Sequence, residues 1–278
     1  MKFTLKCAWL SIVITLLATG VPGFAEAAPP ADFPFALDPL ADAALLGGGL
    51  ALYGGSLVLE QKKPVPDQAD VNPAGVPFFD RLYPSNPSPT LSTVGDDLAI
   101  ASATLPLVLV FGRSGGEILT LGVMYAETLG LAYGLDSFLK SVVVRYRPYA
   151  YSSSTPADFS NSEITASFPS SHATLAFSAA VFAGYIFDTL NPDSTMRVWV
   201  WASGLGIATV VSVLRIASGD HFLSDIVAGG VIGAASGFLV PFFHERIHAI
   251  TTQPSSAVSS IEIQPAGDGV SVRLSLKP

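Results

Sequence analysis

Long apolar stretches separated by short polar segments make up most of the chain, which has 278 residues. The clearest of them predict apolar helices at residues 98–111, 116–144, 170–187, 196–214 and 222–243. A further apolar stretch, residues 40–59, contains glycine clusters that would let a helix pack closely against a neighbour. The whole pattern predicts an all-α fold, a bundle of about six apolar helices.

The last predicted helix carries Gly229, Gly233 and Gly237, each four residues after the one before. Residues at this spacing lie on one face of a helix, so this face can approach a neighbouring backbone closely. The alternative is that a membrane helix simply tolerates glycine there.

The segments between the helices differ in composition. Residues 60–93 are rich in Pro, Asn, Ser and Asp, which indicates a loop. Asp96 and Asp97 are predicted at the start of the next helix, where the helix dipole favours anions. Residues 149–167 are rich in Tyr, Ser and Thr, and we expect them to form a polar loop over a site.

Composition favours a membrane protein or a deeply buried helical core. Half of the residues are hydrophobic, only 13% are charged, and the mean hydropathy is +0.50. Soluble domains carry about 25% charged residues. The net charge of −8 suggests no nucleic-acid partner, whereas the apolar composition suggests the membrane as a partner.

The two ends of the chain have their own character. Residues 1–27 predict a signal peptide, with Lys2 and Lys6 before an apolar run and a small-residue cleavage site; an uncut anchor is the alternative. The only cysteine, Cys7, lies inside it, which excludes a disulfide or cysteine metal site from the mature chain. At the other end, alternating residues on both sides of Gly267 and Gly269 predict a β-hairpin.

These patterns divide the chain into four parts. We expect a signal peptide, an N-terminal helix with a polar loop, a catalytic helical core, and a linker with the hairpin, at residues 1–27, 28–94, 95–246 and 247–278. We expect a cell-envelope membrane protein whose site faces the periplasm. A cleaved signal followed by six spans would place the site on the cytoplasmic side, and this conflict stays open at the level of the sequence.

One polar segment follows the predicted helix at 196–214 and contains Arg215, His221 and Asp225. His221 and Asp225 are four residues apart, so on a helix they share a face. The carboxylate is expected to accept one ring N–H and leave the other nitrogen with an exposed lone pair. Such an imidazole is a nucleophile, and the planar fork of Arg215 suits phosphate oxygens. A purely structural His–Asp pair is the alternative.

A second polar segment is Pro169-Ser170-Ser171-His172 at the start of an apolar run. Pro followed by Ser predicts a helix N-terminus, where free backbone N–H groups bind anions. The hydroxyls of Ser170 and Ser171 can add donors, and His172 can protonate a leaving oxygen. The alternative is an ordinary helix cap with an incidental histidine.

The third segment runs from Lys140 to Arg147 and Pro148 at the end of a long helix. Lys140 and Arg147 reach a common site if the helix ends between them. The alternative is a basic flank that anchors a membrane helix, and Arg145 is assigned to that role rather than to the site.

In this order and spacing, the three segments resemble the motifs of the phosphatidic acid phosphatase type 2 and vanadium haloperoxidase superfamily, which are Lys-x6-Arg-Pro, Pro-Ser-Gly-His and Ser-Arg-x5-His-x3-Asp. The resemblance covers roughly residues 95–245. It implies that His221 is the nucleophile, His172 the general acid and Asp225 the orienting partner. It implies phosphate contacts from Lys140, Arg147, Ser170, Ser171 and Arg215.

The chain departs from the family motifs at two positions. Ser171 replaces the family's glycine, so its Cβ can crowd the phosphate, and Leu214 replaces a serine before Arg215. Neither change removes a charged or nucleophilic group. The reaction class therefore stands, whereas rate and substrate are less well defined.

We therefore expect a phosphatase, a hydrolase that uses a phosphohistidine intermediate and requires no metal or other cofactor. The apolar helices favour a lipid phosphomonoester or pyrophosphate as substrate. Three alternatives remain, an exported soluble acid phosphatase, a vanadate-dependent haloperoxidase, and a non-enzymatic membrane protein. Support for the last is limited to Glu127 and Asp136 within an apolar helix, neither with an evident cationic partner in another helix.

Overall fold

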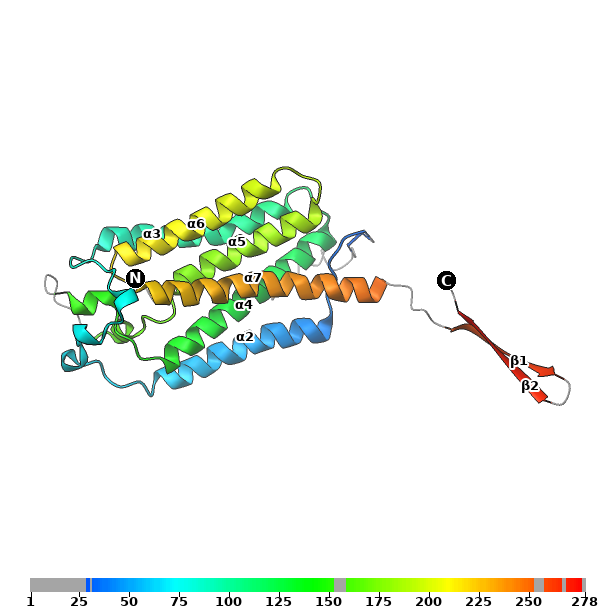
Figure 1. The fold of residues 1–278 in the computed structure, drawn as a ribbon, viewed down its shortest axis with the longest axis horizontal. Helices are drawn as coiled ribbons and strands as arrows, with labels where there is room; N and C mark the ends of the chain where they lie inside the picture. The colour runs from blue at the N-terminus through cyan, green and yellow to red at the C-terminus, as the bar shows by residue number, and fades with distance from the viewer. Residues whose placement is uncertain (1–28, 31, 153–158, 253–257, 267–268, 277–278) are drawn as a thin grey trace.

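The structure is a computed structural model that describes residues 29–30, 32–152, 159–252, 258–266 and 269–276, the last two ranges by their backbone alone. Six long helices run side by side as an elongated bundle (Figure 1). They are α2 (Pro39–Glu60), α3 (Pro89–Thr104), α4 (Gly115–Val142), α5 (Ser171–Leu190), α6 (Arg197–Ala217) and α7 (Leu223–Thr252). A 3₁₀ segment, η4 (Leu105–Val110), continues α3. The predicted helical bundle is confirmed.

The helix ends follow local capping chemistry. The Asp38 carboxylate accepts the N–H groups of Leu40 and Ala41 at the start of α2. Ser114 and Glu117 form a capping box at the start of α4. Gly219, at φ +81, follows the end of α6, because glycine adopts a left-handed conformation without strain and lets the chain turn there.

One predicted helix boundary is wrong. We placed Asp96 and Asp97 at the start of a helix, but α3 begins seven residues earlier, at Pro89, with Ser88 as its cap. Ser followed by Pro is itself a strong helix-start signal. Asp96 therefore lies inside α3, and its side chain contacts residues of α5 and α6.

Segments between the helices contain short 3₁₀ turns. Between α2 and α3 lie η1 (Gln68–Asp70), η2 (Pro73–Gly75) and η3 (Phe78–Asp80). Between α4 and α5 lie η5 (Pro148–Tyr151) and η6 (Ser162–Thr165). These two segments lie at the same end of the bundle (Figure 1).

Two helix pairs touch through glycine. A Cβ added at Gly229 would lie 2.4 Å from the carbonyl oxygen of Ser170, and one at Gly237 would lie 2.5 Å from that of Ser178. The predicted close approach of the last helix is thus confirmed, with α5 as the neighbour. Gly49 of α2 meets the backbone of Gly130 in α4 in the same way.

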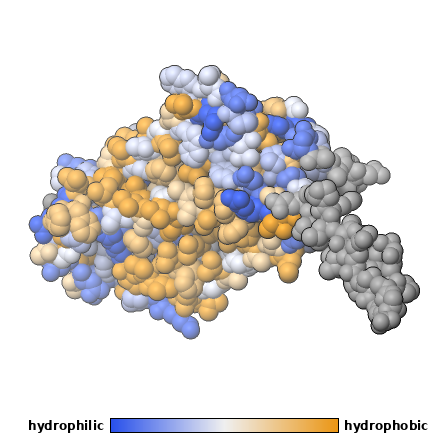
Figure 2. Space-filling view, turned by 45° about the vertical axis from the view of Figure 1, so that its right-hand side comes forward, coloured by the Kyte–Doolittle hydropathy of each residue, from blue (hydrophilic) through white to orange (hydrophobic). Residues whose placement is uncertain are grey.

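All six helices are long and apolar enough to cross a membrane. Large apolar side chains such as Trp199, Val213, Val231 and Phe238 are exposed on the outside of the bundle. Figure 2 shows a broad apolar face over the middle of the molecule, with hydrophilic residues toward its ends. This surface is typical of contact with lipid, so the chain is a membrane protein rather than the soluble alternative.

The two ends of the chain add little to the bundle. The predicted signal peptide, residues 1–27, lies outside the described residues. After α7, the backbones of β1 (Val258–Ala266) and β2 (Gly269–Leu276) run antiparallel. We assign this pair no part in the helical fold, and the hairpin stays a prediction.

The seam between α5 and α7 gives a direct test of the packing. We expect Gly233→Ala to lower the melting temperature, because the new Cβ would lie 2.1 Å from the carbonyl oxygen of Thr174. Overpacking of this kind costs about 1–3 kcal/mol. The control is Gly206→Ala on α6, where no heavy atom lies within 4 Å of the added Cβ. Thermal unfolding in detergent micelles should show a loss for the first variant and none for the second.

Candidate active site

The three polar segments meet at one end of the bundle. They lie at the ends of α4 and α6 and at the starts of α5 and α7, which adjoin one another at that end (Figure 1). Two of these helices, α5 and α7, pack against each other through glycine.

Backbone hydrogen bonds align two of the segments. Residues 145–147 run parallel to residues 164–167, where Arg147 N donates to Ile164 O at 2.8 Å and Ser167 N donates to Arg145 O at 3.1 Å. The third segment joins them, since Tyr149 N donates to Gly219 O at 3.0 Å. Main-chain hydrogen bonds therefore hold these segments together.

His221 is buried, with 1% of its surface exposed. Its Nδ1 lies 2.8 Å from the carbonyl oxygen of Ser167, and because a carbonyl only accepts, Nδ1 carries the proton. The other nitrogen, Nε2, then has the lone pair and lies 3.2 Å from Nη1 of Arg147. This tautomer is the one that a nucleophilic Nε2 requires.

Asp225 does not make the hydrogen bond that we predicted. Its Oδ2 lies 3.7 Å from Nδ1 of His221, beyond hydrogen-bond distance, and the Ser167 carbonyl takes the ring N–H instead. Oδ2 accepts from Ser167 Oγ at 2.6 Å and from Phe222 N at 2.8 Å. Asp225 therefore holds Ser167 and Phe222 in place on either side of His221, and its negative charge lies close to the His221 ring.

Arg145 lies inside this end of the bundle, contrary to the interface role that we predicted. It pairs with Asp225, contacts Asp80 Oδ2 at 2.6 Å, and stacks 4.5 Å above the ring of Phe222. Asp80 also accepts the N–H of Ser224 at 2.9 Å. Asp80 comes from the loop before α3, and a single Asp in a polar loop gave no signal in the sequence.

Two predicted phosphate-binding arginines are already held by acidic and carbonyl groups. Arg215 lies 2.7 Å from Asp96 and 2.7 Å from Asp220. Arg147 donates to the carbonyl oxygens of Glu163 at 2.8 Å and Asp220 at 3.2 Å. Asp220 thus joins the two arginines, and the sequence interpretation missed it although it directly precedes His221.

His172 pairs with an acid on another helix. Its Nε2 lies 2.8 Å from Oδ1 of Asp96, the same oxygen that Arg215 contacts. Its Nδ1 is buried and has no hydrogen-bond partner within the described part of the chain. Contacts through Asp96, Arg215, Asp220 and Arg147 therefore connect His172 with His221.

The start of α5 differs in part from the prediction. The N–H of Ser170 donates to the carbonyl of Asp225 at 3.0 Å, so it is not free for an anion. Ser170 Oγ is buried and has no partner among the described atoms. Ser171, which replaces the family's glycine, donates a hydrogen bond from its Oγ to Asp136 at 2.6 Å. The additional hydroxyl group is therefore held against α4.

Lys140 and Asp136 lie beneath this helix start. Lys140 donates to the carbonyl of Pro169, and its Nζ lies 3.8 Å from Asp136 Oδ2. Asp136, for which the sequence showed no cationic partner in another helix, also accepts a hydrogen bond from the Thr174 hydroxyl of α5 at 3.2 Å. Asp136 thus contacts both Lys140 of the first motif and Ser171 of the second.

Charge and burial both act on His221. Burial disfavours the charged imidazolium, and the positive charges of Arg147, Lys140 and Arg215 add to this, so the pKa of His221 falls well below its usual value. Burial alone would raise the pKa of Asp220, but Arg215 and the Ser218 hydroxyl lower it to about 2. The lowered pKa favours a neutral His221 ring among charged side chains.

Comparisons with known proteins find one family model and several curated relatives that are similar to this chain. Residues 121–248 match the model of the PAP2 superfamily. Undecaprenyl-diphosphatase of Sulfolobus acidocaldarius is 29% identical over 139 residues, which cover 48% of this chain and 58% of that protein. Phosphatidylglycerophosphatase B of Bacillus subtilis is 29% identical over 160 residues, 54% of this chain and 72% of that protein.

A solved structure is similar as well. The crystal structure of the transmembrane PAP2 type phosphatidylglycerolphosphate phosphatase from Bacillus subtilis aligns with a TM-score of 0.48 at 23% identity, over 72% of this chain and 96% of that chain. The chain spans less than two thirds of the length of two curated relatives, 58% and 59%.

The protonation state of His221 can be measured directly, because the chain has only four histidines. We expect its ring to be neutral at pH 6, where an unperturbed histidine, with a pKa of about 6.5, is mostly charged. Nitrogen NMR of histidine-labelled protein, assigned with His221→Gln, reports the state. Titration of this signal at pH 6.5 or above would contradict the electrostatic picture.

Proposed function

We infer, from the match of residues 121–248 to the PAP2 superfamily model, that this chain is a membrane hydrolase that removes phosphate from phosphorylated lipids. One observation carries the proposal. His221 presents a deprotonated Nε2 to the Nη1 of Arg147, within a group of positively charged side chains at the end of an apolar bundle.

In the first step, Nε2 of His221 attacks the phosphorus atom of the substrate. The bond between phosphorus and the ester or anhydride oxygen breaks, and His172 gives its proton to that leaving oxygen. Arg147, Arg215 and Lys140 neutralise the charge on the other phosphate oxygens, which is the main requirement of phosphoryl transfer. The product at this stage is a phosphohistidine.

In the second step, water attacks the same phosphorus atom while His172 accepts its proton. The bond between nitrogen and phosphorus breaks, inorganic phosphate forms, and His221 returns to its starting state. The Ser167 carbonyl supports both steps, because it holds the Nδ1 proton that keeps the lone pair on Nε2. All negative charge on the phosphate is met by side chains of this chain.

Asp96 is the partner that supports His172 in both steps. It accepts from Nε2 of His172 at 2.8 Å, which favours the protonated ring and leaves Nδ1 as the nitrogen that exchanges a proton with the substrate. Asp225, by contrast, acts on His221 through Ser167 and Phe222.

A lipid phosphate fits the surroundings of the site. The bundle has an apolar surface for the acyl or isoprenyl chains, and the relatives are named for undecaprenyl diphosphate and phosphatidylglycerophosphate. A cleft at this end of the bundle is lined by Val76, Val144 and Phe222 together with Arg145, Tyr146 and Tyr151. Phosphatidic acid, isoprenyl diphosphates, phosphatidylglycerophosphate and lipid A phosphates all share the headgroup that this chemistry requires.

Substitution of the nucleophile tests the proposal. We expect His221→Gln to lower phosphate release by about three orders of magnitude or more, because the attacking group is lost. His248→Gln, one histidine outside the site on the same chain, is the control and should retain full turnover. Phosphate release is measured on phosphatidic acid, phosphatidylglycerophosphate, an isoprenyl diphosphate and a soluble phosphomonoester. Wild-type turnover in His221→Gln would show that another group attacks phosphorus.

We also propose that the site faces the periplasm. In a six-span bundle the segments at residues 61–88, 143–170 and 218–222 share one side, opposite residues 111–114 and 191–196. Apart from Lys140, Arg145, Arg147 and Arg215, which belong to the candidate site, three basic residues near the helix ends lie on each side. They are Lys62, Lys63 and Arg81 on the site side, and Arg113, Arg197 and Arg246 on the other, so these charges do not decide the orientation. A periplasmic site requires the start of α2 to be cytoplasmic, an arrangement that conflicts with a cleaved signal peptide before α2.

Single cysteines can test this orientation, because the chain has only Cys7. In a Cys7→Ser background, we expect Ala69→Cys to react with an impermeant maleimide from the periplasm and Asp193→Cys to react only after the inner membrane is opened. Both positions are exposed. The reverse pattern would place the site in the cytoplasm and would leave the phosphatase chemistry unaffected.

A further inference from the structure

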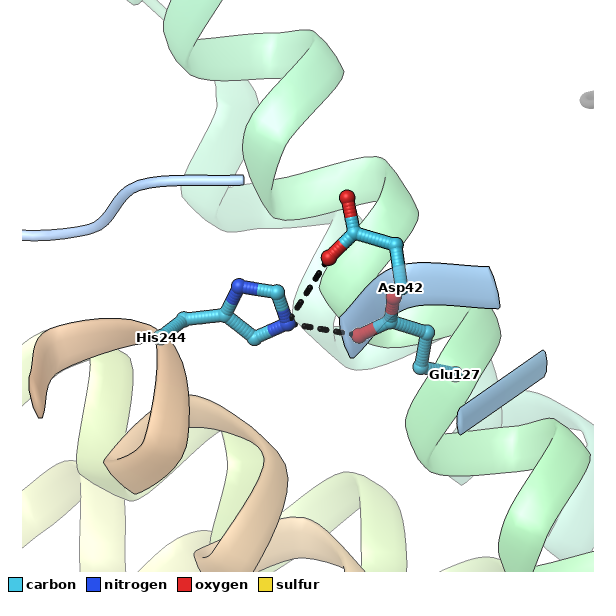
Figure 3. A group of neighbouring side chains, drawn as sticks. All are labelled: Asp42, Glu127 and His244. Carbon is cyan, nitrogen blue, oxygen red and sulfur yellow. Dashed lines mark hydrogen bonds and ion pairs between the residues drawn. The ribbon is translucent and has the colours of Figure 1, made fainter. Parts of the chain in front are cut away.

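A second cluster of titratable side chains lies toward the other end of the bundle. It consists of Asp42 of α2, Glu127 of α4 and His244 of α7 (Figure 3). One ligand atom from each residue lies within 4.8 Å of the other two. Glu127 and His244 are fully buried, at 0% exposure, and the Asp42 side chain is 15% exposed. The proposed phosphatase reaction uses none of them.

The contacts of His244 define its free nitrogen. Nδ1 lies 2.8 Å from the carbonyl oxygen of Ala36, so Nδ1 carries a proton and Nε2 faces the two carboxylates. Figure 3 shows the ring directed toward both acids. Histidines that bind metals usually donate their other ring N–H to a backbone carbonyl or a carboxylate, which fixes the ring as it is fixed here.

The distances bracket those of a bound ion. Nε2 lies 2.7 Å from Glu127 Oε2 and 3.8 Å from Asp42 Oδ1. Ligand atoms at 2.0–2.1 Å from a tetrahedral Zn²⁺ are about 3.3 Å apart, so small side-chain rotations suffice to admit the ion. One imidazole and two carboxylates are ligands that Zn²⁺ takes.

An unsatisfied oxygen and the charge balance point the same way. Oε1 of Glu127 is buried and has no hydrogen-bond partner among the described residues, although a buried carboxylate normally needs one. Two carboxylates face one imidazole, which offsets at most one of the two negative charges. A divalent cation would neutralise both carboxylates and could be coordinated by Oε1 of Glu127.

We propose that Asp42, Glu127 and His244 bind a divalent transition-metal ion, with Zn²⁺ as the best match. The cluster lies many helical turns from His221 along α7, so the ion would take no part in the proposed phosphatase reaction. The ion would link α2, α4 and α7 to the segment before α2. In that segment, Ala36 N donates to the His244 carbonyl, and the Ala36 carbonyl accepts from Nδ1 of the His244 ring. Phe33 and Phe35 of that segment belong to the buried core.

The test uses the full chain, purified in detergent without a histidine tag, stripped with chelator and reloaded with Zn²⁺. We expect one Zn²⁺ per chain by mass spectrometry of the metal after desalting, and a higher melting temperature with Zn²⁺ than with chelator. Mg²⁺ should produce neither effect. Glu127→Gln and His244→Gln should lose the ion and the thermal shift, and Asp42→Asn should bind at least roughly tenfold more weakly.

Two controls keep the result interpretable. His248→Gln removes a histidine one turn further along α7 and should bind Zn²⁺ as the unaltered chain does. Co²⁺ loading of the unaltered chain should give the visible spectrum of a tetrahedral site, and it needs no variant to fold. The proposal would be overturned by a stripped chain that takes up no ion, or by binding in Glu127→Gln and Asp42→Asn that equals that of the unaltered chain. The cluster would then be a proton-sharing contact. Phosphate release is measured separately, so failure here does not bear on the phosphatase.

Discussion

A charge in an apolar bundle must have a partner, and this constraint organises the end of the molecule that holds the site. Arg145 has Asp80 and Asp225, Arg215 has Asp96 and Asp220, and Lys140 has Asp136. An isolated buried charge would cost several kcal/mol or more, so these pairs are needed before any substrate is considered. A phosphate that binds here competes with carboxylates already in place.

The helices supply a second constraint. Gly229, Gly233 and Gly237 bring the backbone of α7 against α5, and the hydrogen bond from Ser170 N to Asp225 O lies at the start of that seam. The two motifs that carry His172 and His221 are therefore joined by main-chain contacts. Their relative position does not depend on flexible side chains, which suits a reaction that demands precise alignment.

The fold was largely predictable from the sequence. Apolar length, glycine spacing and capping residues gave six helices and the α5–α7 contact, because these signals are local or periodic. The start of α3 was missed because the Ser88-Pro89 signal was overlooked beside the more obvious pair of aspartates. The candidate site was predictable as far as its motifs reached, since His172, His221, Arg147 and Arg215 lie at one end of the bundle.

The acids that hold this site were not predictable in the same way. Asp80 and Asp96 lie far from the motifs in the chain, and their pairing with Arg145, His172 and Arg215 exists only once α3 and the preceding loop have folded. Asp225 was assigned to His221 by helical spacing, but the ring N–H found the nearer Ser167 carbonyl. Glu127 likewise gained its partner from a helix more than one hundred residues away.

The glycine contact also restricts how a lipid can arrive. Where α5 and α7 meet, there is no room for even a methyl group between the two main chains. An acyl or isoprenyl tail therefore cannot pass from the bilayer between these two helices. The lipid substrate of the proposed reaction would need to enter the site by another route.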